Sequence, residues 1–256
     1  MHHSFFDSHA HLTSSPLLET IDDVLKRADE ADVRSMITIG TSLELNQQAI
    51  DLAAKYPSVY AAVGLHPEDV FELTDDLVAT LKAQAQQAKV VAIGECGLDY
   101  VRGPEDHQTQ QQLFAAQVNL ARDLDLPLII HSRDAFADLV PILDLAGRRT
   151  GVLHCFAGTL EQANYFLDRG WYLGFTGIVT FKNAQANQDV ARQIPLDRML
   201  LETDCPYLAP QPVRGQTNEP SYIPLIAAMI AELRSISVDE VAEATTANTK
   251  RLFGIQ

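Results

Sequence analysis

Short apolar segments recur along the chain, separated by stretches in which apolar residues return at helical spacing. The apolar segments cover residues 5–12, 35–40, 59–67, 90–100, 126–133, 151–156, 171–177 and 199–208. Intervening stretches such as 17–31, 43–56 and 111–124 place apolar residues every three or four positions, as on one face of a helix. Near-continuous apolar runs are typical of parallel strands buried on both faces, and eight strand–helix units close into a barrel. We therefore predict an α/β protein with a distorted (β/α)8 TIM barrel.

Two further helical patterns follow the eighth apolar segment, at residues 222–233 and 237–253. The second begins at Ser237 with Glu240 three residues later, which is the spacing of a capping box, and it predicts one additional C-terminal helix. Pro141 falls inside an earlier helical stretch and is expected to kink or shorten that helix. A doubly wound open sheet is the alternative fold, but the sequence has no glycine-rich phosphate loop after an early strand.

The length and composition of the chain suit one large domain. Of its 256 residues, 46% are hydrophobic, and no linker-like segment interrupts the pattern, so we predict a single domain over residues 1–256. No apolar stretch approaches the roughly 18 residues of a membrane span, and the first residues lack the basic and apolar regions of a secretory signal. We expect a cytoplasmic protein with no membrane partner and no obligatory protein partner.

The charge of the chain is strongly acidic. Its 34 acidic and 19 basic residues give a formal net charge of −15. Such a charge repels nucleic acids and anionic membranes at long range. A polyanionic substrate therefore requires metal ions or a local basic cluster.

The three cysteines, Cys96, Cys155 and Cys205, each follow an acidic residue or a histidine. Neighbouring residues on a strand point to opposite faces, so each thiol is expected to point away from the polar side chain before it. We predict packed, reduced thiols rather than metal ligands or a disulfide framework.

Polar side chains suited to an active site collect at the C-terminal ends of the predicted strands. Along the chain, these ends carry His9 and His11, His66, Glu95 and Asp99, His131 and Arg133, His154, and Glu202 and Asp204. A barrel places its active site at this end of its strands. Several imidazoles and carboxylates crowded together are costly unless their charges are compensated, and divalent cations compensate them. The pattern predicts a metal centre.

The first strand carries the clearest metal-binding pattern, in which Asp7, His9 and His11 alternate with other residues. His9 and His11 lie two positions apart and face the same side of a strand, so both imidazoles can hold one ion. Asp7 is expected to be a hydrogen-bond partner that orients a ligand. A rim position and a functional role are both open for His66. Glu202 is expected either to touch a third ion or to brace the site.

Eight motifs carry a resemblance to a known family, and in order they are DSHAHL, GLHPED, IGECGLDY, HSRDA, HCFAG, TGIVTFKNA, LLETDCPYLAP and RGQTNEP. From about residue 5 to residue 253, the chain resembles the TatD-type metal-dependent DNases of the amidohydrolase superfamily.

The resemblance implies a catalytic centre with two metal ions. One ion would be held by His9, His11 and Glu95, with Asp204 joining it, and the second by Glu95, His131 and His154. Glu95 would therefore bridge the ions, at a position where many amidohydrolases have a carbamylated lysine. Asp204 would take a proton from the attacking water. By resemblance, Glu95 and Asp204 are the catalytic residues.

The resemblance further implies hydrolysis of DNA phosphodiester bonds, as a 3′–5′ exonuclease on single strands. Two divalent ions, which could be zinc, magnesium or manganese, would supply hydroxide for the attack and stabilise charge on the phosphoryl group. The candidate substrate contacts follow strand ends and are His66, Arg102, Arg133, Lys182 and Arg214. Gln216 and Thr217 stand where more basic versions of the last motif carry lysine or arginine, which predicts a weaker grip on phosphate.

Two other functions are compatible with the same residues. The first is ester or amide hydrolysis, such as removal of a D-amino acid from tRNA or opening of a small cyclic amide, which the same metal centre would serve. The second is a metal-binding partner protein without activity, but such a protein has no need of Asp204 beside a two-metal cluster. Assays on oligonucleotides, aminoacyl-tRNA and small esters distinguish these functions.

Overall fold

The computed structural model describes residues 4–69, 74–104, 106–145, 147 and 150–256. Eight strands follow one another in a single parallel sheet, in the order β1 to β8, and helices alternate with them along the chain. The predicted fold class, a distorted (β/α)8 barrel with an additional C-terminal helix, is confirmed. The chain divides into two compact units, Met1–Ile37 with Cys155–Gln256, and Thr38–His154. The single domain over residues 1–256 stays a prediction.

The unit formed by both ends of the chain contains β1, most of β2, β7 and β8. These strands are β1 (Phe5–Ala10), β2 (Val33–Ile39), β7 (Tyr172–Phe175) and β8 (Met199–Leu201), and the helices are α1 (Ser15–Leu18), α2 (Ile21–Glu30), α7 (Leu160–Leu167), α8 (Gln185–Gln193), α9 (Ile223–Arg234) and α10 (Val238–Phe253). Short 3-10 helices are η1 (Gly177–Thr180), η2 (Leu196–Arg198), η3 (Gln211–Val213) and η4 (Pro220–Tyr222). Ala10, the last residue of β1, forms an isolated bridge with Cys205 in the segment after β8.

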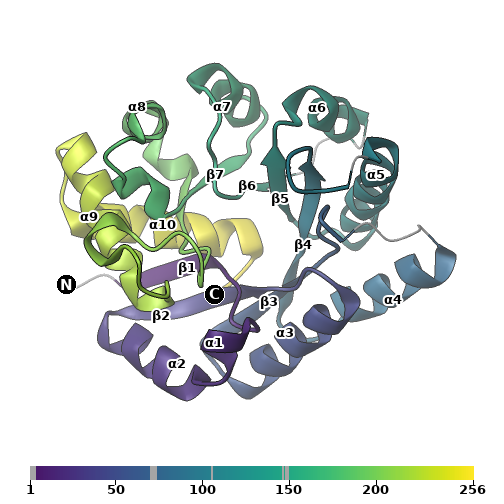
Figure 1. The fold of residues 1–256 in the computed structure, drawn as a ribbon, viewed down its shortest axis with the longest axis horizontal. Coiled ribbons are helices and arrows are strands. Elements are labelled where there is room, and N and C mark those ends of the chain that lie inside the picture. The colour runs from purple at the N-terminus through teal and green to yellow at the C-terminus, as the bar shows by residue number, and fades with distance from the viewer. Residues whose placement is uncertain (1–3, 70–73, 105, 146, 148–149) are drawn as a thin grey trace. The chain divides into compact units, whose positions relative to one another are not determined.

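The additional C-terminal helix is α10, which packs with α9 against β1 and β8 (Figure 1). It begins with the predicted capping box, because the Ser237 hydroxyl accepts from the Glu240 amide while the Glu240 carboxylate accepts from the Ser237 amide. Among the described residues, no single helix is long and apolar enough to span a membrane. The segments 220–234 and 238–253 reach that length only together, across a bend of 113°.

The second unit contains the end of β2 and the four strands β3 (Val59–Val63), β4 (Val90–Asp99), β5 (Leu128–Arg133) and β6 (Gly151–Leu153). Its helices are α3 (Leu43–Lys55), α4 (Asp75–Ala85), α5 (His107–Leu124) and α6 (Phe136–Leu145). Pro141 lies inside α6, which continues for four residues beyond it. The proline therefore does not end the helix, and the alternative that it kinks the helix stays a prediction.

Two buried glutamines of α5 fix the ends of β3 and β4. Gln110 accepts from the backbone N–H of Asp99 at 2.9 Å and donates to its carbonyl at 3.0 Å. Gln117, seven residues later, makes the same pair of bonds to Leu65, at 2.8 and 3.0 Å. Each side-chain amide therefore replaces a strand partner where the chain leaves the sheet, just before His66 and at Asp99.

Replacing Gln117 by leucine should lower the free energy of unfolding by about 2–5 kcal/mol. Leucine has about the same volume as glutamine, but the substitution leaves the amide and carbonyl of Leu65 buried without their partner. Each unsatisfied group costs about 1–3 kcal/mol. Urea unfolding measures the change, and Gln112→Leu on the exposed side of α5 is the control, expected within about 0.5 kcal/mol of the parent. Equal effects of the two substitutions would contradict the role assigned to Gln117.

Candidate metal centre

His9 and His11 project from the end of β1 with their Nε2 atoms 3.3 Å apart. The carboxylate of Asp204, which follows β8, brings its Oδ1 atom to 3.2 Å from Nε2 of His11 and 3.7 Å from Nε2 of His9. Ligand atoms that share one ion at bond lengths near 2.0–2.2 Å lie about 3–3.6 Å apart. The three side chains are therefore spaced as ligands of one divalent ion.

The backbone around this group is tied together across β1 and the segment after β8. The amide of Asp204 donates to the carbonyl of His9, and the amide of His11 donates to the carbonyl of Cys205, both at 2.9 Å. Asp204 has a positive φ of 57°, a conformation that aspartate tolerates better than most residues. This turn directs the Asp204 carboxylate towards the two imidazoles.

Asp7 lies beneath this group and is fully buried. Its carboxylate accepts from the backbone amides of His9 and Thr203 and, at 2.6 Å, from the hydroxyl of Thr203. Burial raises the pKa of Asp7 to about 7, although these hydrogen bonds oppose the shift. Asp7 thus positions His9 through the backbone amide of that residue, as a hydrogen-bond partner at the strand end.

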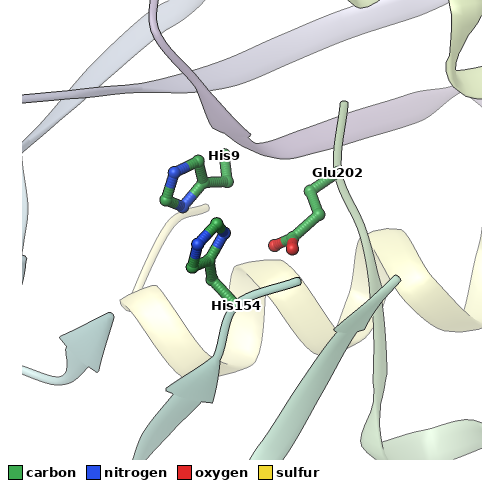
Figure 2. A group of neighbouring side chains, drawn as sticks. All are labelled: His9, His154 and Glu202. Atoms are coloured by element: carbon green, nitrogen blue, oxygen red, sulfur yellow. The ribbon is translucent and has the colours of Figure 1, made fainter. Parts of the chain in front are cut away.

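Glu202 braces the same unit. Its carboxylate accepts from the backbone amide of Cys155 and, at 3.4 Å, from the hydroxyl of Ser8. Gly174 on β7 leaves the space for this carboxylate, because a Cβ atom there would collide with it. Figure 2 shows the Glu202 carboxylate and the His9 ring extending from their strands towards the same region, and a carboxylate oxygen lies within 4.8 Å of a ring nitrogen of His9. Of the two predicted roles, the hydrogen bonds favour the brace.

In the second unit, three imidazoles surround one oxygen of Glu95. Its Oε1 atom lies 2.9 Å from Nδ1 of His131, 3.0 Å from Nε2 of His154 and 3.4 Å from Nε2 of His66. Glu95 is 2% exposed, so its charge needs a partner in place of water. Gly97, two residues along β4, lets this strand approach β5, because a Cβ atom there would collide with the backbone oxygen of His131.

Asp99 fixes the orientation of His131. Its Oδ2 atom lies 2.9 Å from Nε2 of His131, while its Oδ1 atom accepts from the amides of Val101 and Arg102. Burial opposes ionisation of Asp99, but the hydrogen bonds from His131 and these amides outweigh it and hold the pKa of Asp99 well below its usual range. Asp99 is therefore ionised and accepts the Nε2 proton, while Nδ1 lies within hydrogen-bond distance, 2.9 Å, of Oε1 of Glu95. A carboxylate that fixes a histidine in this way is a regular companion of metal ligands.

Replacing Asp99 by asparagine should weaken metal binding by about 10- to 100-fold, because the amide cannot fix His131 in the ligand tautomer with the same strength. Competition with a chromophoric chelator measures the affinity. Asp138→Asn is the matched control, since this exposed carboxylate accepts from the hydroxyl of Tyr100 on the surface of its unit. Unchanged affinity in Asp99→Asn would show that His131 does not depend on Asp99.

His66 faces Glu95 but is arranged as a donor. Its Nδ1 atom accepts a hydrogen bond of 3.1 Å from the amide of Glu68, so in the neutral ring the proton resides on Nε2. Nε2 is the nitrogen that faces Oε1 of Glu95. His66, Glu95 and His131 are close enough to share an ion, with ligand atoms within 4.8 Å of one another, but the bond from Glu68 opposes coordination by His66. This favours the predicted substrate contact over a metal ligand.

The predicted basic contacts lie on the surface of their units. The guanidinium of Arg102 lies 3.9 Å from the carboxylate of Glu68, and its side chain is 66% exposed. The guanidinium of Arg214 lies over the ring of Phe181, 4.0 Å from its centroid. Arg133, the last residue of β5, and Lys182 are exposed. Their contacts with a substrate stay predictions.

The cysteines behave as packed thiols. All three are reduced, Cys96 and Cys205 are buried, and burial raises the pKa of each of these two thiols above the usual value. Among the described residues, the candidate ligand groups contain histidine and glutamate side chains and no cysteine. A buried thiol that resists ionisation suits packing and not metal binding, as the alternation of faces predicts.

The six predicted ligands thus form two groups of nitrogen and oxygen donors. His9, His11 and Asp204 converge in one unit, and Glu95, His131 and His154 converge in the other. Each group has two imidazoles and one carboxylate, a donor set that suits zinc and manganese and tolerates magnesium. The spacing within each group fits one ion. Sequence reasoning placed Asp99 at the same strand end as Glu95 but gave it no role, although its place four residues after Glu95 on the same strand face was a usable signal.

Comparisons with known proteins cover nearly the whole chain. Residues 6–254 match the family model described as TatD related DNase. The metal-dependent hydrolase YabD of Bacillus subtilis is 42% identical over 252 residues, which cover 98% of this chain and 99% of that protein. The 3′-5′ ssDNA/RNA exonuclease TatD of Citrobacter rodentium is 38% identical over 257 residues, covering 98% of each chain.

A solved structure shows the same similarity in three dimensions. The crystal structure of YjjV, a TatD homologue from Escherichia coli, superposes with a TM-score of 0.92 at 35% identity, covering 98% of each chain. A hydrolase of the TatD family from Entamoeba histolytica superposes with a TM-score of 0.90 at 28% identity over the whole of both chains. The fold and the sequence therefore give the same assignment.

Proposed function

Because the chain belongs to the family of TatD-related DNases, we propose that this metal-dependent hydrolase degrades single-stranded DNA from its 3′ end. The exonuclease TatD of Citrobacter rodentium, similar over 98% of the chain, supports both the direction and the preference for single strands. The observation that carries the proposal is the spacing of the two ligand groups, since each presents two imidazoles and a carboxylate to one point.

We propose that the protein binds two divalent ions, one at each ligand group, as the resemblance to the TatD family implies. The six ligands lie within strands of the parallel sheet, as His9, Glu95 and His131 do, or in the segments that follow its strands, as His11, His154 and Asp204 do. Glu95 is the proposed bridge between the two ions, the role that the resemblance to the family implies for it. When bound, divalent ions polarise the phosphodiester and make water more acidic, effects worth several kcal/mol.

The side chains divide the remaining work. Asp204, whose side chain is 13% exposed, accepts the proton of the attacking water. His66 presents an N–H donor through Nε2, suited to an anionic phosphoryl oxygen. Asp99, Asp7 and Glu202 hold the ligands in place. Arg133 and Arg214 are the proposed phosphate contacts, and few such contacts are expected in a chain of net charge −15.

The test is hydrolysis of a 5′-labelled single-stranded oligonucleotide by protein supplied in turn with zinc, manganese and magnesium. Stepwise shortening from the 3′ end, slower on a duplex and abolished by chelator, is the expected result. The same preparations are assayed on a D-aminoacyl-tRNA and on small cyclic amides and esters. Turnover of one of these compounds with an intact oligonucleotide would overturn the proposed nuclease function in favour of ester or amide hydrolysis.

A further inference from the structure

One exposed aromatic ring stands beside the candidate metal ligands. Tyr207, three residues after Asp204, is 59% exposed, and it is the aromatic member of the exposed large apolar side chains among the described residues. The other described phenylalanine, tyrosine and tryptophan side chains are buried or half-buried. Exposure of a large ring beside a reactive centre suggests a contact that a ligand completes.

The exposure of Tyr207 does not result from a loosely held backbone. Its amide donates to the carbonyl of Asp204 at 3.0 Å, and its carbonyl accepts from the side chain of Asn218 at 2.5 Å. Asn218 is itself buried and also donates to the carbonyl of Thr203 at 2.8 Å. The segment from Thr203 to Tyr207 is therefore fixed on both sides, so the ring is presented in a defined position.

The ring of Tyr207 neighbours a candidate ligand directly. Its centroid lies 6.1 Å from that of the His11 imidazole, with an angle of 68° between the rings. The two rings meet in this T-shaped arrangement while 59% of the Tyr207 side chain stays exposed, so much of its surface remains for a further partner. Nε2 of His11 lies 3.2 Å from Asp204, which places Tyr207 next to the proposed proton acceptor.

The charge of the molecule makes such a ring useful. A chain of net charge −15 gains little affinity for nucleic acid from long-range attraction. Stacking of a base on an aromatic ring provides affinity that does not depend on charge and tolerates any base. The guanidinium of Arg214, which lies over the ring of Phe181 in the same unit, supplies one positive charge, but the net charge of the chain remains strongly negative.

We propose that Tyr207 is a stacking subsite for a nucleobase, which holds the nucleotide next to the hydrolysed phosphodiester of a single strand. The inference rests on the proposed nuclease function and adds the part of the substrate that this ring recognises. It predicts that the enzyme binds any nucleobase by stacking and does not select among the four bases. The hydroxyl of Tyr207 is not required.

The experiment compares two oligonucleotides that differ only at the 3′-terminal residue, which carries a base in one and is abasic in the other. Tyr207→Ala should lower kcat/KM on the oligonucleotide with the base by about 5- to 150-fold, the range of base–aromatic stacking, and leave the abasic one nearly unchanged. Tyr207→Phe should retain the parental values, whereas Tyr207→Leu should behave as alanine. Tyr165→Ala on α7, whose ring is already covered by Arg169, is the control expected at the parental rate.

Binding provides a readout that is independent of turnover. An oligonucleotide with 2-aminopurine at its 3′ end should lose fluorescence on binding the chelator-treated parent and the phenylalanine variant, and less so with the alanine variant. Equal losses of kcat/KM on both oligonucleotides, or unchanged quenching with alanine, would overturn the inference alone. Hydrolysis of neither oligonucleotide by the parent enzyme would overturn the proposed function, and the stacking subsite with it.

Discussion

Replacing Glu95 by glutamine should remove most of the bound metal and lower turnover by at least roughly 10²-fold. One oxygen of Glu95 lies beside His131, His154 and His66, so three imidazoles share a single carboxylate. An amide keeps the shape but withdraws the negative charge that holds divalent ions. The bound ions lower the activation free energy by several kcal/mol, so their loss slows the reaction by the corresponding factor.

Metal content per chain, measured by elemental analysis after purification without chelator, tests this expectation. Cys155→Ser is the matched control. Cys155 directly follows the candidate ligand His154, and its thiol lies 3.6 Å from the hydroxyl of Thr176. The serine variant should keep its metal. If it lost metal to the same extent as Glu95→Gln, the interpretation of the thiols as packing groups would be wrong; if Glu95→Gln kept its metal, Glu95 would not be the bridge.

The strand ends could be predicted from the sequence because periodicity reports them directly. Apolar runs of a parallel sheet stop where polar side chains begin, and residues two apart on a strand share a face. His9 and His11 follow this rule and do converge, as do Glu95 and His131 on neighbouring strands. Predicting that Asp204 lies beside His9 requires more than the periodicity of the sequence, because this contact depends on the left-handed backbone conformation of Asp204.

The roles within the site were less accessible because they depend on single torsion angles. Nδ1 of His131 faces Glu95 and Nε2 faces Asp99, an orientation set by the ring torsion and not by the spacing of residues. Similarly, the donor role of His66 follows from the amide of Glu68, which reaches Nδ1 only because of the local turn. Sequence reasoning could name these residues but could not separate ligand from donor.

The contacts of the basic side chains could not be predicted from the sequence, because these side chains are long and flexible. Arg102 and Arg214 are predicted contacts because they follow strand ends, yet their long side chains can meet many partners. In the structure Arg102 approaches Glu68, an ion pair on the surface that is worth little in stability, and Arg214 covers Phe181. Position in the sequence limits where the Cα atom lies, while the guanidinium can lie several ångströms away.

Replacing Asp204 by asparagine should reduce turnover by roughly 10²- to 10⁴-fold while leaving most of the bound metal in place, the effect expected when a general base is lost. The asparagine can still coordinate through its oxygen, and His9 and His11 remain 3.3 Å apart as ligands. Its amide cannot accept the proton of the attacking water. Single-turnover rates on a 3′-labelled oligonucleotide, with the metal content of each sample measured in parallel, separate the loss of the base from the loss of the ion.

Two further variants determine which carboxylate is the base. Glu202 already accepts hydrogen bonds from Cys155 and Ser8, so Glu202→Gln should perturb the rate less than Asp204→Asn at equal metal content. Asp168→Asn, on the exposed end of α7, controls for the change in net charge and should match the parent. If Asp204→Asn hydrolysed DNA at the parental rate with full metal while Glu202→Gln did not, the proton would pass to Glu202, and the hydrogen bonds of that residue would have to open during turnover.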